Sequence, residues 1–189
     1  MTESTSIEKN DEIIKPDFAS NGSRIGAYLT DSLLLIIIML PLNYLNFLNF
    51  KSFTIYLIIG LIGILYKPLT EYYFGMTLGK YALDMKVTNL KFEKMDLKQS
   101  FLRSSILLIA PILSIPIQFL AFNNPELMSI ESYFDFATRI TIEYPIQKMI
   151  SYLSFVIVLV DLIFMLTDKE KLFRTLHDRI GKTYVIKTK

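Results

Sequence analysis

The sequence predicts an all-α membrane protein, a four-transmembrane-helix bundle with short cytoplasmic strand segments and interfacial helices. Three observations predict this class. The 189-residue chain is 52% hydrophobic and has a positive mean hydropathy, which is too apolar for a soluble domain of this size. Four apolar stretches are long enough to cross roughly 30 Å of hydrocarbon. Lysine and arginine gather on one side of these stretches, as the positive-inside rule requires.

The chain begins with a polar segment and two closely linked helices. Residues 1–22 are rich in acidic side chains and are predicted to form a disordered cytoplasmic tail, followed by a membrane domain over residues 23–189. The first membrane helix is expected at about residues 25–45 and the second at about residues 53–73. The loop between them is so short that the two helices must be antiparallel neighbours.

Two short segments have the pattern of strands. Residues 83–88 alternate between apolar and polar side chains, and residues 183–187 form a similar unit near the C-terminus. Because either strand alone would leave its backbone unpaired, the two could pair if they lie on the same side of the membrane. The GMTLGK sequence at residues 75–80 is one residue short of a phosphate-binding loop and follows a membrane helix, so nucleotide binding is not expected.

The third membrane helix is expected at about residues 97–122. Asp96 and Gln99 have the spacing of a capping box and mark its start. Pro111 and Pro116 lie inside this stretch, and each removes a helix hydrogen bond. A kinked or broken helix is therefore predicted.

The last part of the chain is predicted to hold an interfacial helix, the fourth membrane helix and a surface helix. Residues 123–148 have amphipathic spacing, with Pro145 near the exit of the interfacial helix. The fourth membrane helix is expected at about residues 150–167. The cytoplasmic C-terminal segment, residues 168–189, should form a short helix on the membrane surface that ends at a glycine cap, Gly181.

The distribution of positive charge predicts the orientation. Of 20 lysine and arginine residues, 17 fall in the N-terminal tail, the central loop with its flanking helix ends, and the C-terminal segment. Four spans place these three regions on one side. The positive-inside rule makes that side cytoplasmic, so a multi-pass plasma (inner) membrane protein with both termini in the cytoplasm is predicted.

The ionisable residues within and beside the spans all fall in the cytoplasmic half of the bilayer. Charged groups in hydrocarbon are costly, so they face partners, water or transported ions rather than lipid. The sequence therefore predicts a polar cluster or ion pathway made by six residues: Arg24, Asp31, Lys67, Glu71, Arg103 and Asp161.

Two interpretations of this cluster remain open. Arg24 and Asp31 lie seven residues apart on one helix face and could form a structural ion pair. Alternatively, Asp31 and Asp161 could bind a cation or proton in a pathway. Lys67 and Glu71, four residues apart, could neutralise each other.

Composition argues against several other functions. The chain has no cysteine and one histidine, His177, so neither a metal site nor a cofactor is expected. His177 and Asp178 form a pair of the kind found in catalytic sites, but no serine or cysteine nucleophile is evident with them. The favoured interpretation is that they lie at the end of a surface helix. We therefore expect a non-enzymatic protein. The net charge of +2 gives no basis for nucleic-acid binding.

Four separated pieces of the chain carry a family pattern. Arg24, Ala27 and Asp31 match the opening of a first helix, Arg-x-x-Ala-x-x-x-Asp, and Arg103 is similar to the arginine that opens a later one. Two further segments resemble GxTxGK and LHDxxAGT motifs through the following residues: Gly75, Thr77, Gly79, Lys80, Leu176, His177, Asp178, Arg179, Gly181 and Thr183. Together these pieces resemble the RDD family of small prokaryotic membrane proteins, named for one arginine and two aspartates.

The resemblance implies a membrane protein that takes part in transport. It assigns the second aspartate to Asp178, with Asp161 as the rival. We expect a small transporter or cation/proton antiporter embedded in the lipid bilayer, with a homo-oligomer as its expected form. The alternative is a non-catalytic membrane subunit or regulator that docks a partner through residues 75–89 and 172–187.

Overall fold

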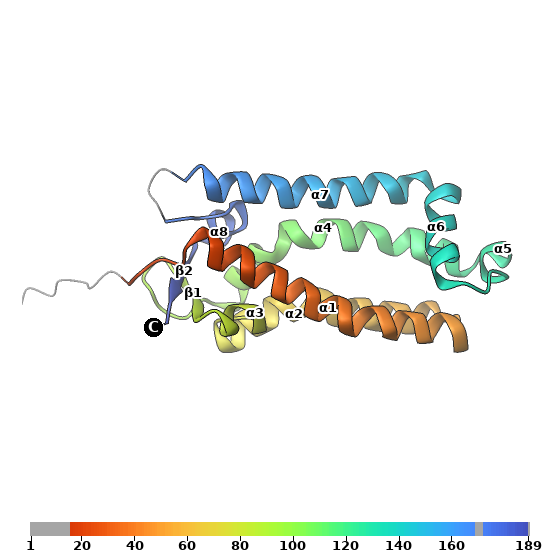
Figure 1. The fold of residues 1–189 in the computed structure, drawn as a ribbon, viewed down its shortest axis with the longest axis horizontal. Helices are drawn as coiled ribbons and strands as arrows, with labels where there is room; N and C mark the ends of the chain where they lie inside the picture. The colour runs from red at the N-terminus through yellow and green to blue at the C-terminus, as the bar shows by residue number, and fades with distance from the viewer. Residues whose placement is uncertain (1–15, 169–171, 189) are drawn as a thin grey trace, which may run out of the picture.

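Four long helices dominate the computed structural model, which describes residues 16–168 and 172–188. Within these residues, the same four helices are the ones long and apolar enough to cross a membrane. They run side by side along the long axis of the molecule (Figure 1): α1 (Asn21–Asn49), α2 (Phe53–Phe74), α4 (Leu97–Phe122) and α7 (Pro145–Leu166). The predicted four-helix membrane class is confirmed.

The outer faces of these helices are apolar and uncovered. Large side chains such as Leu33, Ile36 and Phe155 are more than half exposed. In water such a surface would drive aggregation, whereas in a bilayer it faces lipid, and the helices satisfy their own backbone hydrogen bonds. The long helices are therefore arranged to span a membrane.

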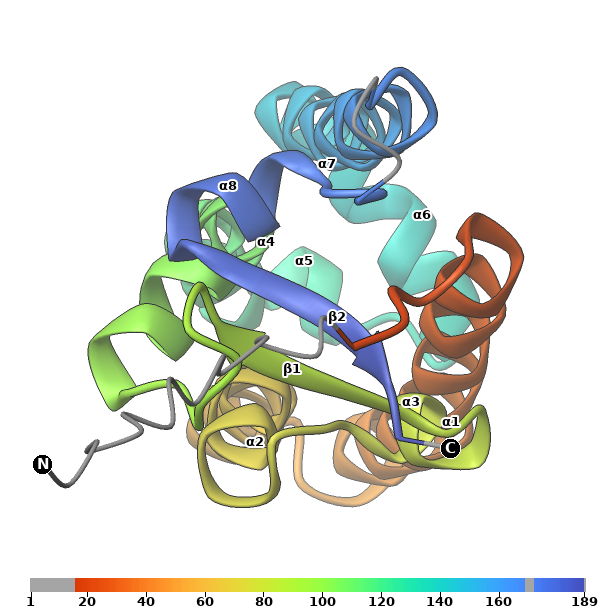
Figure 2. The same ribbon diagram turned by 90° about the vertical axis from the view of Figure 1, so that its left-hand side faces the viewer.

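A small sheet closes one end of the bundle, called the sheet end below. Strands β1 (Met85–Asn89) and β2 (Thr183–Lys187) pair antiparallel, with Val87 opposite Val185. Strand β2 runs across this end of the bundle from α8 towards α3 (Figure 2). The predicted strand pairing is thus correct, and its buried side chains form a core with Ala27 and Met95.

The N-terminal segment also joins this sheet. Phe18 pairs with Ile186, and the backbone of residues 17–19 exchanges hydrogen bonds with β2 at 2.8 and 3.0 Å. The predicted disordered tail is therefore wrong for its last residues, because their backbone finds an open strand edge; residues 1–15 lie outside the described residues.

Two short helices flank the sheet. Helix α3 (Leu78–Ala82) follows the end of α2, and α8 (Leu176–Gly181) precedes β2. Helix α8 does not lie on the membrane surface as predicted, because His177 and Asp178 are buried against the long helices. Gly181 is not its cap either; Lys182 ends the helix with a φ of 52°.

The opposite end is closed by α5 (Pro125–Met128) and α6 (Tyr133–Glu143). Phe47 packs against Phe136 there, in a second apolar core. The expected interfacial helix is thus split in two, and it ends before Pro145. That proline begins α7, since a helix tolerates proline in its first turn, and the fourth span starts five residues earlier than predicted.

Helix α4 is continuous. The capping box of Asp96 and Gln99 is present as predicted. The helix nevertheless runs without a break past Pro111 and Pro116, so the possibility of a broken helix is wrong. The hydrogen bonds on either side keep the helix intact, as membrane helices commonly allow.

Candidate functional site

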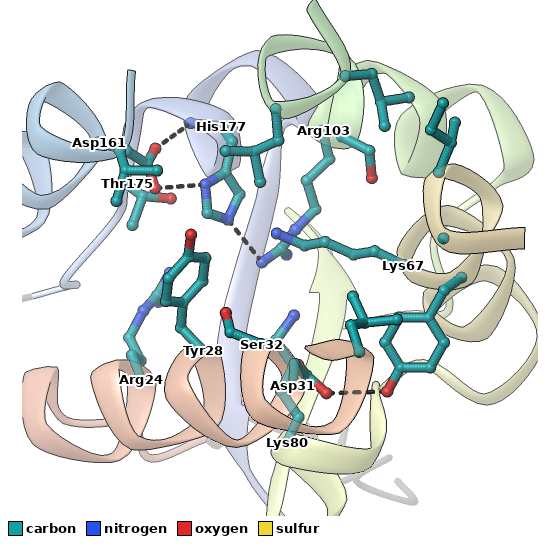
Figure 3. A pocket seen from close by; sticks show the side chains of 18 of the residues that line it. Arg24, Tyr28, Asp31, Ser32, Lys67, Lys80, Arg103, Asp161, Thr175 and His177 are labelled. Atoms are coloured by element: carbon teal, nitrogen blue, oxygen red, sulfur yellow. Dashed lines mark hydrogen bonds and ion pairs between the residues drawn. The ribbon is translucent and has the colours of Figure 1, made fainter. Parts of the chain in front are cut away.

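A cavity of about 530 Å³ lies among the four long helices and reaches the sheet end. Leu35, Leu108 and Leu162 contribute to its apolar walls. Its floor near the sheet is polar (Figure 3). The charged and hydrogen-bonding residues that line the cavity are Arg24, Tyr28, Asp31, Ser32, Tyr66, Lys67, Lys80, Arg103, Ser104, Asp161, Thr175 and His177.

Asp178 is the centre of the charge network below the cavity. Its side chain is 0% exposed and pairs with Arg24 from α1 and with Arg103 from α4, the latter at 2.9 Å. It also accepts the backbone N–H of Thr175 at 3.1 Å, in the capping box that begins α8. The two guanidinium groups hold the pKa of Asp178 well below its usual range despite burial. One carboxylate therefore joins α1, α4 and α8.

Glu71 forms the second junction. This buried carboxylate pairs with Lys80 of α3, and its other oxygen lies 3.2 Å from Nε of Arg103. Burial, followed by repulsion from Arg103, lowers the pKa of Lys80 to about 7 against the attraction of Glu71. The predicted pairing of Lys67 with Glu71 is wrong, because Arg103 and Lys80 occupy the carboxylate instead.

Asp31 does not pair with Arg24. It accepts three hydrogen bonds: from the hydroxyl of Thr77 at 2.5 Å, from the hydroxyl of Tyr66 at 2.9 Å and from the backbone N–H of Gly79 at 2.8 Å. The predicted Arg24–Asp31 ion pair is therefore wrong. The two residues share a helix face, yet each meets a different partner, α8 for the arginine and the N-terminus of α3 for the aspartate.

Close backbone contacts explain two motif glycines. A Cβ atom at Gly79 would lie 2.2 Å from the carbonyl oxygen of Ala27, so only glycine lets α3 approach α1 closely enough for Asp31 to cap it. A Cβ atom at Gly181 would lie 2.7 Å from Cβ of Arg103. Glycine here brings α8 against α4, which is a packing role rather than the helix cap that the sequence predicts.

Asp161 and His177 form a third junction, between α7 and α8. The imidazole Nδ1 and the backbone N–H of His177 lie 2.7 and 3.0 Å from the two oxygens of Asp161. Nε2 lies 3.2 Å from the guanidinium of Arg103, which can only donate. Burial and the nearby Lys67 ammonium lower the pKa of His177 to about 4. The imidazole is therefore neutral near pH 7, with its proton on Nδ1.

Lys67 differs from the other charged residues of the floor. Its ammonium group points into the cavity beside Arg103 (Figure 3). Among the described residues it has neither a hydrogen-bond acceptor nor a carboxylate within 4.0 Å. The cavity thus contains one ammonium group that the described residues leave without an ion-pair or hydrogen-bond partner.

The six predicted cluster residues are brought together at one end of the bundle, although with other pairings than expected. Pattern analysis of the spans missed Lys80, His177 and Asp178 as members, because these residues lie in short segments outside the membrane helices. The only available signal was the family pattern. The other residues of the family pattern lie close by. Gly75 ends α2, and Thr77 caps the start of α3. Thr183 begins β2 and accepts a hydrogen bond from Arg103 at 3.2 Å, whereas Arg179 pairs with Asp168 at the surface at 3.0 Å.

Within residues 16–168 and 172–188, no group of three or more His, Asp or Glu side chains is placed to hold a metal ion. The carboxylates of the network instead face arginine, lysine and hydrogen-bond donors.

Comparison with protein families decides the membership of the chain. The model of the RDD family matches residues 18–182, which cover all four long helices, the GxTxGK segment and all but the last residue of the LHDxxAGT segment. The chain belongs to the RDD family. No curated protein and no solved structure matched it. In this RDD protein, Arg24 pairs with Asp178, and Asp31 is the acceptor at the start of α3.

Proposed function

We propose that this RDD protein is a small transporter and that the cavity is its solute chamber. The observation that carries the proposal is a cavity of about 530 Å³ inside the membrane-spanning bundle, bordered by charged residues of both signs. Its volume falls within the roughly 300–1,000 Å³ of typical small-molecule sites. Ionisable groups at membrane depth are expensive and characteristically line the paths of solutes and ions.

The coupled ion is proposed to be a proton or small cation that binds at Asp161. This carboxylate lines the cavity, and His177 is its partner among the described residues. The neutral imidazole and the backbone N–H of His177 hold the carboxylate in place by hydrogen bonds, while the carboxylate borders the cavity from which a cation or proton would reach it. Asp31 is a weaker candidate, since three donors already occupy it.

The sheet end is proposed to face the cytoplasm of a plasma membrane. The support is the positive charge concentrated at that end, as the positive-inside rule describes. The chain has no cysteine, so single cysteines can be introduced at Lys91 and at Glu131 near opposite ends. In whole cells, an impermeant maleimide should label Glu131→Cys, and it should label Lys91→Cys only after permeabilisation. The reverse pattern would invert the proposed orientation.

Transport can be tested by ion flux in proteoliposomes. A sodium or potassium gradient should drive proton movement through the wild type, and Asp161→Asn should reduce the rate to that of empty liposomes. Asp135→Asn is the matched control, because Asp135 is exposed on α6 at the far end. Absence of flux in the wild type would count against the antiporter, and full flux in Asp161→Asn would remove Asp161 from the pathway.

A docking subunit is the second candidate function. It is favoured by aromatic side chains that remain well exposed near the sheet end, namely Tyr73, Phe74 and Tyr81. These could contact a membrane partner. Cross-linking in native membranes from Tyr81 should then yield a defined complex that Tyr81→Glu abolishes, whereas free protein alone would exclude a stable partner.

A further inference from the structure

The positive charges on the cavity floor are unequally neutralised. Arg24 pairs with Asp178, Lys80 pairs with Glu71, and Arg103 contacts both carboxylates. Lys67 has no ion-pair partner among the described residues. Nη1 of Arg24 is also buried and has no hydrogen-bond acceptor among the described residues, on a side chain that is 7% exposed. Two cationic side chains on one floor thus retain unused donors.

The carboxylates nearby do not supply the missing acceptor. Asp31 is held by Tyr66, Thr77 and Gly79, and Asp161 is held by His177. A cation placed beside Lys67 would meet the like charge of Arg103 as well. An anion is therefore the ligand that fits this position, because an unpaired ammonium in a low-dielectric site gains most from an opposite charge.

The rest of the cavity has a different character. Aliphatic side chains from all four long helices also line the cavity: Ile25, Leu35, Ile64, Leu107, Val158 and Leu162. A small hydrated anion would leave these walls without a contact, whereas an alkyl chain would bury its apolar surface against them, and each methylene would add to the affinity. The cavity thus combines one anion-binding end with one apolar end.

We infer that the cavity binds an anionic amphiphile, with its carboxylate or phosphate head on Lys67 and its alkyl tail between the helices. The inference rests on the proposed function in taking the cavity as the solute chamber, and it names the class of solute. The shared chemistry covers two sources, a free alkyl acid and an anionic membrane lipid.

Binding can be measured directly with radiolabelled decanoate and the full-length protein in phosphatidylcholine nanodiscs. Saturable binding is expected, and unlabelled decanol and acetate should each compete at least tenfold more weakly, since one lacks the head and the other the tail. Adding phosphatidylglycerol to the nanodiscs separates the sources. Displacement of decanoate indicates a lipid ligand, and retention of decanoate indicates a free acid. Competition by decanol equal to that by decanoate would overturn the inference.

Variants of Lys67 identify the head-group site. Lys67→Met keeps a similar length without charge and should weaken decanoate binding about tenfold or more, whereas Lys67→Arg should retain it. Lys148→Met is the control, because that lysine is exposed near the far end and stacks over Tyr152 at 6.0 Å. Unchanged binding in Lys67→Met would overturn the assignment. Binding without ion flux would contradict the proposed transport alone, and flux without binding would contradict this inference alone.

Discussion

Replacement of Asp178 by asparagine should be among the most destabilising conservative changes in the chain. Asparagine keeps the shape and one acceptor for the cap of α8, but it removes the charge that Arg24 and Arg103 share. Asp178 is 0% exposed and the Arg24 side chain 7% exposed, so little water can replace the lost partner. Breaking a buried ion pair by removing one member costs about 3–5 kcal/mol. For a chain of this length, the unfolding temperature should fall by roughly 6–20 °C.

The assay is thermal unfolding in one detergent, with Arg179→Gln as the comparison. That substitution also breaks an arginine–aspartate pair, but Arg179 is 45% exposed, so the expected loss is about 0–1 kcal/mol. The double variant Arg24→Met with Asp178→Asn should recover part of the loss, because the stranded guanidinium is gone. The reasoning is refuted if Asp178→Asn and Arg179→Gln shift the transition equally, or if the double variant is no more stable than Asp178→Asn.

Two further predictions concern protonation and packing. Because burial and Lys67 lower the pKa of His177 to about 4, below the ordinary 6.5, the folded state binds fewer protons than the unfolded state between these values. The free energy of unfolding should fall by up to about 3 kcal/mol as pH drops from 6.5 to 4. When unfolding is measured across this pH range, His177→Asn should lose less stability than the wild type. An equal loss in both proteins would contradict the assignment. Gly79→Ala should cost roughly 1–3 kcal/mol in the same unfolding assay, because its Cβ would lie 2.2 Å from the Ala27 carbonyl oxygen. Gly60→Ala, with nothing within 4 Å, should be tolerated, and equal losses in both variants would argue against the close contact.

Most of the fold follows from local properties of the sequence. Hydropathy and length determine the four spans, and the capping box of Asp96 and Gln99 locates the start of α4 correctly. Alternation over residues 83–88 and 183–187 identifies the strands, and the need to pair their backbones brings them together. Errors arose where a local signal has two meanings. Pro145 can end one helix or begin the next, and only packing of the far end decides between them.

The partners within the site were much harder to predict. Depth in the bilayer places Arg24, Asp31 and Arg103 in one region, but it does not reveal which carboxylate each arginine meets. Asp178 lies 154 positions from Arg24 in the sequence and reaches it because β2 pairs with β1 and draws α8 under the bundle. Sequence spacing predicts pairs between neighbours on one helix, such as Arg24 with Asp31. In the structure, buried contacts with other elements take the place of these pairs.

The three aspartates share one structural role, which is to join the sheet end to the membrane helices, and Lys67 does not take part in it. Asp31 holds α3 on α1, Asp178 holds α8 on α1 and α4, and Asp161 holds α8 on α7. Each fastens a segment of the sheet end to a membrane helix, so loss of any one should disturb structure as well as transport. Lys67 makes no such contact among the described residues, although a charged group at this depth in a membrane is costly. A charge that makes no such contact is best explained by a ligand that enters the cavity. Substitution of Lys67 should therefore change ligand binding and leave the stability of the fold largely unchanged.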